Sequence, residues 1–279
     1  MLKKILSHIL PSPAYSSHKR TNELITAIRD LKKDVKDLKN LASSSPASQP
    51  QKEEEWFVRD YQNYVQRLIN DSNSVDDAMS IAVGGNYADV GKGLCSLLLS
   101  LGLKTGMRVV DFGCGSGRLA TSLPVEYNLD YLGIDIVDEL LNYAASKSPK
   151  NYKFMRHCEL SVPVESDSAD IICAFSVFTH LLHHETYIYM EDMKRALKKD
   201  GILVFSFLEF GYAGHWPIFD FTMQATKENR LEVQNIYMEK PVVELFAKKL
   251  GFTLSYIGEG TEDPPGSNIH GHSIAVYKK

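Results

Sequence analysis

The sequence predicts an α/β fold in which a helical N-terminal arm precedes a seven-stranded, mostly parallel sheet with an antiparallel edge hairpin. Three observations predict it. Short apolar segments alternate with helix-like segments over residues 108–207, which is typical of a parallel sheet covered on both faces. The last two apolar segments are joined only by a loop containing Pro264-Pro265-Gly266, so we expect them to pair antiparallel. A turn with three alternating glycines follows the first apolar segment, where a strand meets the next helix.

The composition is that of an ordinary globular chain of 279 residues, with 44% hydrophobic and 24% charged residues. The formal net charge of −4 argues against a general nucleic-acid binder, because such proteins are basic. Residues 1–41 carry nine Lys and Arg against four Asp and Glu, a net of +5, so the remainder carries −9. The four cysteines lack metal-binding or disulfide-framework spacing, which favours reduced thiols and a cytoplasmic location. Neither a membrane span nor a signal peptide is predicted.

Residues 1–50 are predicted to form a basic helical arm and a linker. Residues 1–10, ended by Pro11 and Pro13, read as a short amphipathic helix that touches the inner face of a membrane, packs on the protein or stays frayed. A heptad pattern follows, with apolar residues at Leu24, Ile28, Leu31, Val35 and Leu38. These two heptads favour self-association through residues 24–38 as a short coiled coil, slightly over an amphipathic helix packed on its own domain. The run ASSSPASQPQ then predicts a linker.

Residues 51–279 are predicted to form one domain that starts with a helical cover over 51–101. The first helix of this cover carries Trp56, Phe57, Tyr61, Tyr64, Val65 and Leu68, which we expect to pack on the domain and in part to cover a ligand. The predicted strands are Arg108–Asp111, Tyr131–Asp135, Tyr152–Arg156, Ile171–Phe175, Ile202–Phe207, Thr253–Ile257 and Ser273–Tyr277. The helices predicted between them are Arg118–Leu123, Asp138–Ser146, His184–Lys199 and Pro241–Leu250. Residues 209–240 read as an irregular, aromatic insertion on the substrate side.

Aspartates end the first two predicted strands of the sheet. In a parallel sheet the ligand lies beyond the carboxyl ends of the strands, so both are candidates for a binding site. We expect Asp111 to organise the glycine turn through its backbone N–H groups. Asp135 stands where a carboxylate can accept hydrogen bonds from ribose hydroxyls, and Ile136 can lie flat on a purine ring. Together with the free N–H groups of a helix start, this predicts a nucleotide-like ligand.

The stretch DFGCGSGRL, followed by YLGID, resembles motif I and the acidic second-strand end of class I S-adenosylmethionine-dependent methyltransferases. Its glycine spacing is GxGxG, whereas dinucleotide-binding turns have GxGxxG. The stretches ADIICAFSVFTHL and MEDMKRALKKDGILVFSF are similar to the family's fourth strand with its loop and to its helix, turn and fifth strand. The resemblance covers residues 80–279 and implies a Rossmann-like fold with S-adenosyl-L-methionine as cofactor.

The resemblance implies that the three glycines of the turn approach the methionine and ribose part of the cofactor. Where the family often has an Asp beside the adenine amino group, this chain has Cys158, so Glu159 is expected to make that contact as the better acceptor. Ser176 is expected to face the methionine end. Taken together, the candidate cofactor-binding residues are Asp111, Gly113, Cys114, Gly115, Gly117, Asp135, Ile136, Cys158, Glu159 and Ser176.

Methyl transfer to a hydroxyl group needs a base close to the acceptor. His180, in the SVFTHL loop, is the first candidate, weighed evenly against a histidine that caps or packs the next helix. His215 is the second candidate, and Glu209, which can equally bind substrate hydroxyls, is the third. A metal site is not predicted, because the adjacent residues of the His183-His184-Glu185 cluster point in different directions on a helix.

The sequence favours a methyltransferase that O-methylates a sugar, a polysaccharide or another small-molecule acceptor. The segments VFTHL and GHSIAVYKK are similar to bacterial methyltransferases that accompany surface-polysaccharide synthesis, which is an analogy only. A natural-product or quinone-type acceptor is the alternative within this class. A nicotinamide-dependent oxidoreductase, against which the GxGxG spacing argues, and an inactive methyltransferase-like scaffold are the alternatives from other classes.

Overall fold

The computed structural model describes residues 26–27, 29–30, 32–33, 56–258 and 271–279. The chain divides into two compact units, Met1–Glu53 and Glu54–Lys279. In the first unit the described residues are helical and exposed. The five apolar residues of the predicted heptads lie outside the described residues, as does the Pro264-Pro265-Gly266 loop.

Self-association through residues 24–38 is a prediction that a shortened chain tests. Removing residues 1–45 is expected to leave a folded unit that still binds cofactor but assembles into particles with fewer subunits, because the heptads are gone. Light scattering measures the mass of the particle, and calorimetry with S-adenosylhomocysteine measures binding. Equal numbers of subunits in the two chains would contradict the coiled-coil prediction.

The described residues form one sheet of seven strands in the order β3-β2-β1-β4-β5-β7-β6. The strands are β1 (Arg108–Phe112), β2 (Asp130–Asp135), β3 (Lys153–Arg156), β4 (Ala169–Ala174), β5 (Leu197–Phe207), β6 (Thr253–Gly258) and β7 (Ser273–Lys278). The pairs from β3 to β5 are parallel, whereas β7 is antiparallel to both β5 and β6. The predicted mixed sheet with an antiparallel edge is confirmed. Strand order reverses direction between β1 and β4, and such a switch point opens a crevice at the carboxyl ends of the strands.

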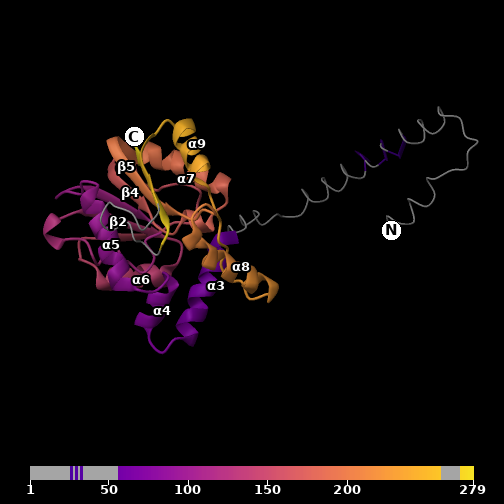
Figure 1. Ribbon diagram of the computed structural model, residues 1–279, viewed down its shortest axis with the longest axis horizontal. Coiled ribbons are helices and arrows are strands. Elements are labelled where there is room, and N and C mark those ends of the chain that lie inside the picture. The colour runs from indigo at the N-terminus through magenta and orange to yellow at the C-terminus, as the bar shows by residue number, and fades with distance from the viewer. Residues whose placement is uncertain (1–25, 28, 31, 34–55, 259–270) are drawn as a thin grey trace, which may run out of the picture. The chain divides into compact units, whose positions relative to one another are not determined.

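Helices cover both faces of this sheet (Figure 1). They are α3 (Trp56–Asp71), α4 (Val75–Ala82), α5 (Tyr87–Ser100), α6 (Asp138–Lys147), α7 (His183–Ala196), α8 (Trp216–Lys227) and α9 (Lys240–Leu250), with 3₁₀ turns η1 (Val125–Tyr127), η2 (Phe178–His180) and η3 (Ala213–His215). Successive strand residues face opposite sides, so Val110 packs in the core with α7 and α9, while Val109 packs with α5. Burial on both faces explains why the strands read as continuous apolar runs.

Two helices predicted from the sequence differ from the structure: one is not a helix, and the other ends earlier than predicted. Residues 118–123, predicted as a helix, form consecutive turns instead. Gly117, at a φ of 88°, and Pro124 bound this segment, which leaves too few residues for a cooperative helix. The helix predicted over 184–199 ends at Ala196, because Leu197 already pairs with Ala169 of β4.

The insertion over residues 209–240, predicted to be irregular, contains α8. Pro217 stands in the first turn of this helix, where its missing N–H costs no intrahelical bond. The helix buries Thr222 and Ala225 but leaves Trp216 and Phe221 exposed, at 47% and 58%. The insertion therefore supplies a helical cover with apolar side chains on its outer surface.

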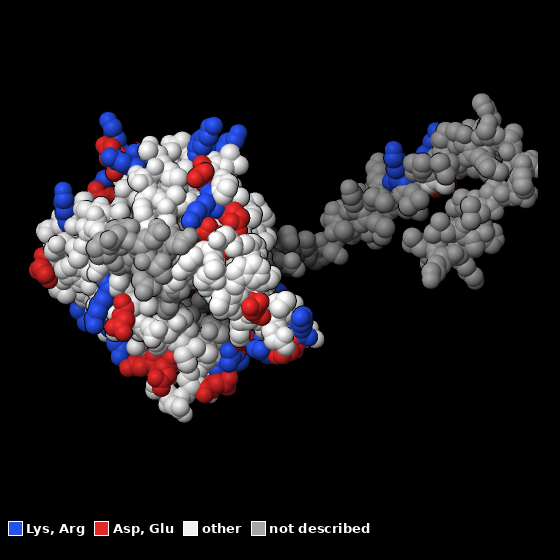
Figure 2. All heavy atoms as spheres, viewed as in Figure 1, with Lys and Arg blue, Asp and Glu red and all other residues white. Residues whose placement is uncertain are grey.

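Charges of both signs are mixed on the surface of the second unit. Figure 2 shows Lys and Arg side chains next to Asp and Glu over the visible face. Among the helices that the structure describes, none combines the length and the apolar character needed to cross a membrane.

Candidate functional site

A cavity of about 620 Å³ lies beyond the carboxyl ends of β1, β2 and β4. We call its wall at the sheet the inner half, which consists of residues 111–115, Arg118, residues 134–136 and residues 175–177. The outer half consists of side chains from α3, from α8 and from the loops beside them: Tyr61, Tyr64, Arg67, Leu68, His180, Ile218, Phe221, Arg230, Leu231, Glu232, Val233 and Asn235. The volume is within the range of small-molecule sites, and the position is the switch point of the sheet.

The glycine turn is held by the end of β2. The N–H groups of Gly113 and Cys114 donate to the carbonyl of Ile134 at 2.7 and 3.0 Å, and Gly115 N–H donates to Asp135 Oδ2 at 2.8 Å. We expected Asp111 to organise this turn, but the carboxylate that accepts from it belongs to Asp135. The neighbouring strand end reaches the turn because β1 and β2 run parallel in register, with Phe112 opposite Ile134.

Asp135 is almost fully buried on the wall of the cavity, with 8% of its surface exposed. Its Oδ1 accepts the N–H groups of Ile136 and Val137, at 2.8 and 3.1 Å. Burial raises the pKa of this carboxyl, and the backbone N–H groups, led by that of Gly115, act in the opposite direction. Three backbone donors therefore hold the carboxylate in a fixed orientation at the end of β2.

Asp111 lies on the same wall, but its carboxylate contacts side chains of the neighbouring strands β2 and β4. Its Oδ2 accepts the hydroxyl of Tyr131 at 2.6 Å, and the thiol of Cys173 lies 3.5 Å from its Oδ1. Burial raises the pKa of Asp111 to about 6, against the lowering effect of the Tyr131 hydrogen bond. The inner half thus presents a buried acid beside the guanidinium of Arg118, which is 6% exposed. Burial lowers the pKa of Arg118 to about 10.

The three alternating glycines are required by packing as well as by backbone conformation. All have positive φ, at 73°, 55° and 88° for Gly113, Gly115 and Gly117. A Cβ on Gly113 would meet Val177, and one on Gly115 would meet Val83, at 2.3 and 2.6 Å. Gly117 does not line the cavity; a Cβ there would meet Ala144 of α6 at 2.8 Å. The third glycine thus allows α6 to approach the turn.

Replacing Gly117 with alanine is expected to lower the free energy of unfolding by about 2–5 kcal/mol. The estimate combines strain from a left-handed backbone, about 1–2 kcal/mol, with overpacking against Ala144, about 1–3 kcal/mol. Gly102→Ala is the matched control, because Gly102 has a φ of 95° but open space around its Cβ position. Urea denaturation measures both variants, and equal losses would show that α6 packing plays no part.

The residues expected at the adenine, Cys158 and Glu159, do not line the cavity, whereas His157 does. The N–H of His157 donates to the carbonyl of Asp135 at 3.0 Å, which places its ring beside the end of β2. Glu159 is exposed, and its carbonyl accepts the hydroxyl of Tyr189 at 3.0 Å. The sequence carried no signal for His157. A shift of one residue along the chain changes which side chain faces the cavity, and no local pattern fixes that shift.

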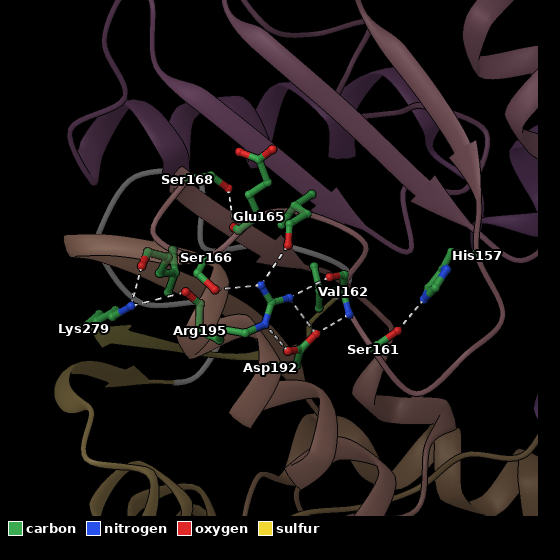
Figure 3. A network of polar contacts seen from close by, with 11 residues as sticks. His157, Ser161, Val162, Glu165, Ser166, Ser168, Asp192, Arg195 and Lys279 are labelled. Atoms are coloured by element: carbon green, nitrogen blue, oxygen red, sulfur yellow. Dashed lines mark hydrogen bonds and ion pairs between the residues drawn. The ribbon is translucent and has the colours of Figure 1, made fainter.

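An arginine on α7 fixes the chain after β3 (Figure 3). Arg195 donates to the carbonyls of Val162 and Val164, each at 2.9 Å, and pairs with Asp192. Asp192 in turn accepts the N–H of Val162 at 2.6 Å, and the Arg195 guanidinium lowers the pKa of its carboxyl. Because this network anchors the segment that begins at His157, the cavity wall there is preformed.

His180 lies in η2 and lines the outer half of the cavity. Its Nδ1 lies 2.8 Å from the carbonyl of Gln234, and its ring contacts the edge of Tyr61 at 5.7 Å between centroids. A carbonyl only accepts, so Nδ1 carries the proton and Nε2 carries the lone pair. Burial lowers the pKa of His180, which keeps the ring neutral at neutral pH.

The second and third base candidates lie together outside the cavity lining. His215 is 1% exposed; its Nδ1 accepts the N–H of Glu209 at 2.9 Å, and its Nε2 donates to the carbonyl of Gly271 at 2.7 Å. The buried carboxylate of Glu209 accepts the hydroxyl of Ser273 and lies 3.6 Å from Nζ of Lys240. These contacts join the end of β5 to the start of β7, so both residues act structurally here.

Ser176 lies on the cavity wall at the end of β4, in a left-handed conformation with a φ of 59°. Its N–H donates to the hydroxyl of Ser206 at 2.7 Å, and that hydroxyl also contacts Nδ1 of His272 at 3.4 Å. A non-glycine residue with positive φ at a strand end often marks a functional position. Ser176 is therefore part of the inner half, and its contact with the methionine end of a cofactor stays a prediction.

Several residues on the wall were not singled out in the sequence. They are Arg67, Arg118, His157, Phe221, Arg230, Glu232 and Asn235. Arg118 had a signal, since it directly follows the glycine turn. The others come from α3, from the chain after β3, and from α8 with the segment that follows it, and they meet through tertiary packing rather than through a local motif. Within the described residues, no group of three or more His, Cys, Asp or Glu is arranged to hold a metal ion.

Comparison with known proteins identifies the type of domain. Residues 110–205 match the family described as a methyltransferase domain. The chain is 34% identical over 119 residues to a ubiquinone/menaquinone biosynthesis C-methyltransferase of Campylobacter jejuni, which covers 40% of this chain and 49% of the relative. It is 30% identical over 120 residues to an uncharacterized methyltransferase of Bacillus subtilis, covering 40% and 44%. The chain thus spans about half the length of the curated relatives that it matches.

Solved structures share the fold over most of the chain. Magnesium protoporphyrin IX methyltransferase from Synechocystis, crystallised with S-adenosylhomocysteine, aligns with a TM-score of 0.55 at 16% identity, over 78% of this chain and 93% of that one. A chain of the complex between the Haloferax volcanii Trm112 methyltransferase activator and a putative methyltransferase aligns with a TM-score of 0.56 at 14% identity, over 80% and 96%. At these identities the likeness shows the fold.

Proposed function

We propose that this chain, which carries a methyltransferase domain of the class I fold, transfers a methyl group from S-adenosyl-L-methionine to a small-molecule acceptor. One observation carries the proposal. The carboxylate of Asp135 stands at the end of β2, locked onto the glycine turn and facing a cavity at the switch point of the sheet. A carboxylate in that position suits the ribose of a nucleoside.

The chemistry of the inner half fits this cofactor. A carboxylate has about four lone-pair sites, and backbone N–H groups take three of those of Asp135, so a ribose hydroxyl can donate to the site that remains on Oδ2. The buried guanidinium of Arg118 suits the carboxylate of the methionine moiety. The carboxyl of Asp111 suits its amino group, and Ile136 offers an apolar surface to the adenine.

The cofactor supplies a sulfonium whose methyl group is already electrophilic. The residues of the chain therefore need to align the acceptor, exclude water and accept a proton. His180 is the group that can accept it, because Nδ1–H is committed to Gln234 and the lone pair on Nε2 remains. A base at this position suits methylation at oxygen, since a hydroxyl must lose its proton as the new bond forms.

The acceptor has two candidates that make different demands on the cavity. The sequence favours a sugar or polysaccharide hydroxyl, and the name of the Campylobacter jejuni relative favours a quinone-type molecule. That relative is described as a C-methyltransferase, so the likeness supports the class of acceptor rather than the atom methylated. Both candidates agree with a methyl group delivered near His180.

Calorimetric titration tests the proposed function against the oxidoreductase alternative. The full chain is titrated with S-adenosylhomocysteine and, in a separate experiment, with NAD. Binding of S-adenosylhomocysteine with no heat from NAD is the expected result, since GxGxG places a different ligand on the turn from GxGxxG. Binding of NAD alone would overturn the proposal.

A further inference from the structure

Aromatic rings form much of the outer half of the cavity. Tyr61 and Tyr64 of α3 meet edge to face, with centroids 5.8 Å apart, and Tyr61 also contacts the ring of His180. From α8, Ile218 and Phe221 complete this apolar lining. Phe221 is 58% exposed at a cavity wall, where a ring of this size offers a contact surface to a ligand.

The cations of the outer half are already neutralised by carboxylates. Arg67 makes two hydrogen bonds to Glu232 and a third to Asp71, while Arg230 pairs with Glu228. A phosphate or carboxylate on the acceptor would have to compete with these carboxylates for the same guanidinium groups. The outer half therefore favours an acceptor without charge.

Two polar side chains of the outer half already have hydrogen-bond partners within the protein. The Tyr61 hydroxyl donates to the carbonyl of Ala82 at 3.0 Å, and Asn235 donates to Thr222 at 2.8 Å. A sugar would bring several hydroxyls into this space, and each buried hydroxyl without a partner costs about 1–3 kcal/mol. A planar molecule with a single hydroxyl would leave fewer of its own hydroxyl groups without a hydrogen-bond partner.

We propose that the acceptor is an uncharged aromatic molecule with a hydroxyl on its ring, packed against Tyr64 and Phe221 with that hydroxyl at His180. The inference rests on the proposed methyl transfer. It chooses between the two candidate classes of acceptor, because a phenolic ring fits the apolar, neutralised outer half and a sugar does not.

The acidity of the hydroxyl agrees with this choice. In the step itself, the acceptor oxygen forms a bond to the methyl carbon, the carbon–sulfur bond breaks with its electron pair left on sulfur, and the hydroxyl proton passes to Nε2 of His180. A neutral imidazole is a weak base, yet a phenol loses its proton with a pKa of about 10. A sugar hydroxyl is a weaker acid than a phenol, so it gives up its proton to such a base less readily.

The test uses the full chain saturated with S-adenosylhomocysteine and titrated with three probes. They are 2-naphthol, methyl β-D-glucopyranoside and UDP-glucose. We expect 2-naphthol to bind at least tenfold more tightly than either sugar. Tighter binding of either sugar would overturn the aromatic acceptor and leave the proposed function intact. Absence of S-adenosylhomocysteine binding in the first titration would instead overturn the proposed function.

A variant pair on α8 locates the binding surface. Phe221→Ser is expected to weaken 2-naphthol binding about three- to tenfold, the fold-change that corresponds to a lost aromatic pair. Met223→Ser is the matched control, because Met223 is 40% exposed on the same helix but does not line the cavity. Both variants should bind S-adenosylhomocysteine as the parent does. Equal naphthol affinity in the two variants would overturn the proposal.

Discussion

Replacing His180 with alanine is expected to lower the rate constant of methyl transfer about 10²–10⁴-fold, the contribution that a positioned base makes. Binding of S-adenosylhomocysteine changes little, because His180 belongs to the outer half of the cavity. Single-turnover kinetics with methyl-labelled cofactor measure the rate, and calorimetry measures the binding. His183→Ala is the control: its Nε2 lies 2.9 Å from the carbonyl of Tyr237, so it loses a similar contact to the same segment.

The pH dependence separates a base from a packing residue at position 180. Burial lowers the pKa of His180 below its ordinary value of 6.5, and the bond to Gln234 opposes this only in part. A base works when unprotonated, so the parent rate should be flat through neutral pH and fall as the pH drops through the lowered pKa. In the alanine variant, this fall in rate at low pH should be absent. The same fall in rate at low pH in both proteins would show that another group titrates.

Replacing Asp135 with asparagine is expected to weaken S-adenosylhomocysteine binding about 10- to 150-fold. A hydrogen bond to a charged group contributes about 1.5–3 kcal/mol, and each 1.4 kcal/mol is a factor of ten. The amide also turns an NH₂ group toward a backbone donor, either that of Gly115 or those of Ile136 and Val137. Cofactor binding and the order of the glycine turn are therefore lost together.

Asp138→Asn is the matched control for this variant. Asp138 begins α6 and its carboxylate lies 3.7 Å from Arg156, outside the cavity lining. We expect it to bind S-adenosylhomocysteine as the parent does. Urea denaturation of both proteins separates a local loss of binding from a general loss of stability. Unchanged affinity in Asp135→Asn would remove the ribose contact from the proposal.

The sheet was predictable because its signals are local. The parallel strands β1, β2 and β4 are short, largely apolar runs buried on both faces, and Asp111 and Asp135 mark the ends of β1 and β2. The residue that accepts hydrogen bonds from the glycine turn was harder to predict. Both aspartates end adjacent strands, and only the backbone geometry decides that Asp135 accepts from Gly115.

The outer half of the cavity was harder to predict than the inner half. The pattern of α8 was hidden because Phe221 lies on another side of the helix from Trp216 and Phe219, whose rings contact each other, and this blurs the helical period. His215 looked like a base because histidines in insertions often are functional, yet its two nitrogens bond to backbone groups of distant segments. Such partners are set by tertiary contacts that no local pattern reports.

The ion pair between Arg67 of α3 and Glu232 joins two parts of the outer half. Both side chains are partly exposed, at 44% and 38%, and an exposed pair contributes at most about 1 kcal/mol. A contact of this strength changes an equilibrium constant by no more than about fivefold. Because salt weakens an exposed ion pair, we expect acceptor and product to exchange faster past Arg67 and Glu232 as ionic strength rises. The signature of this ion pair is therefore a salt-dependent exchange rate rather than a change in binding affinity.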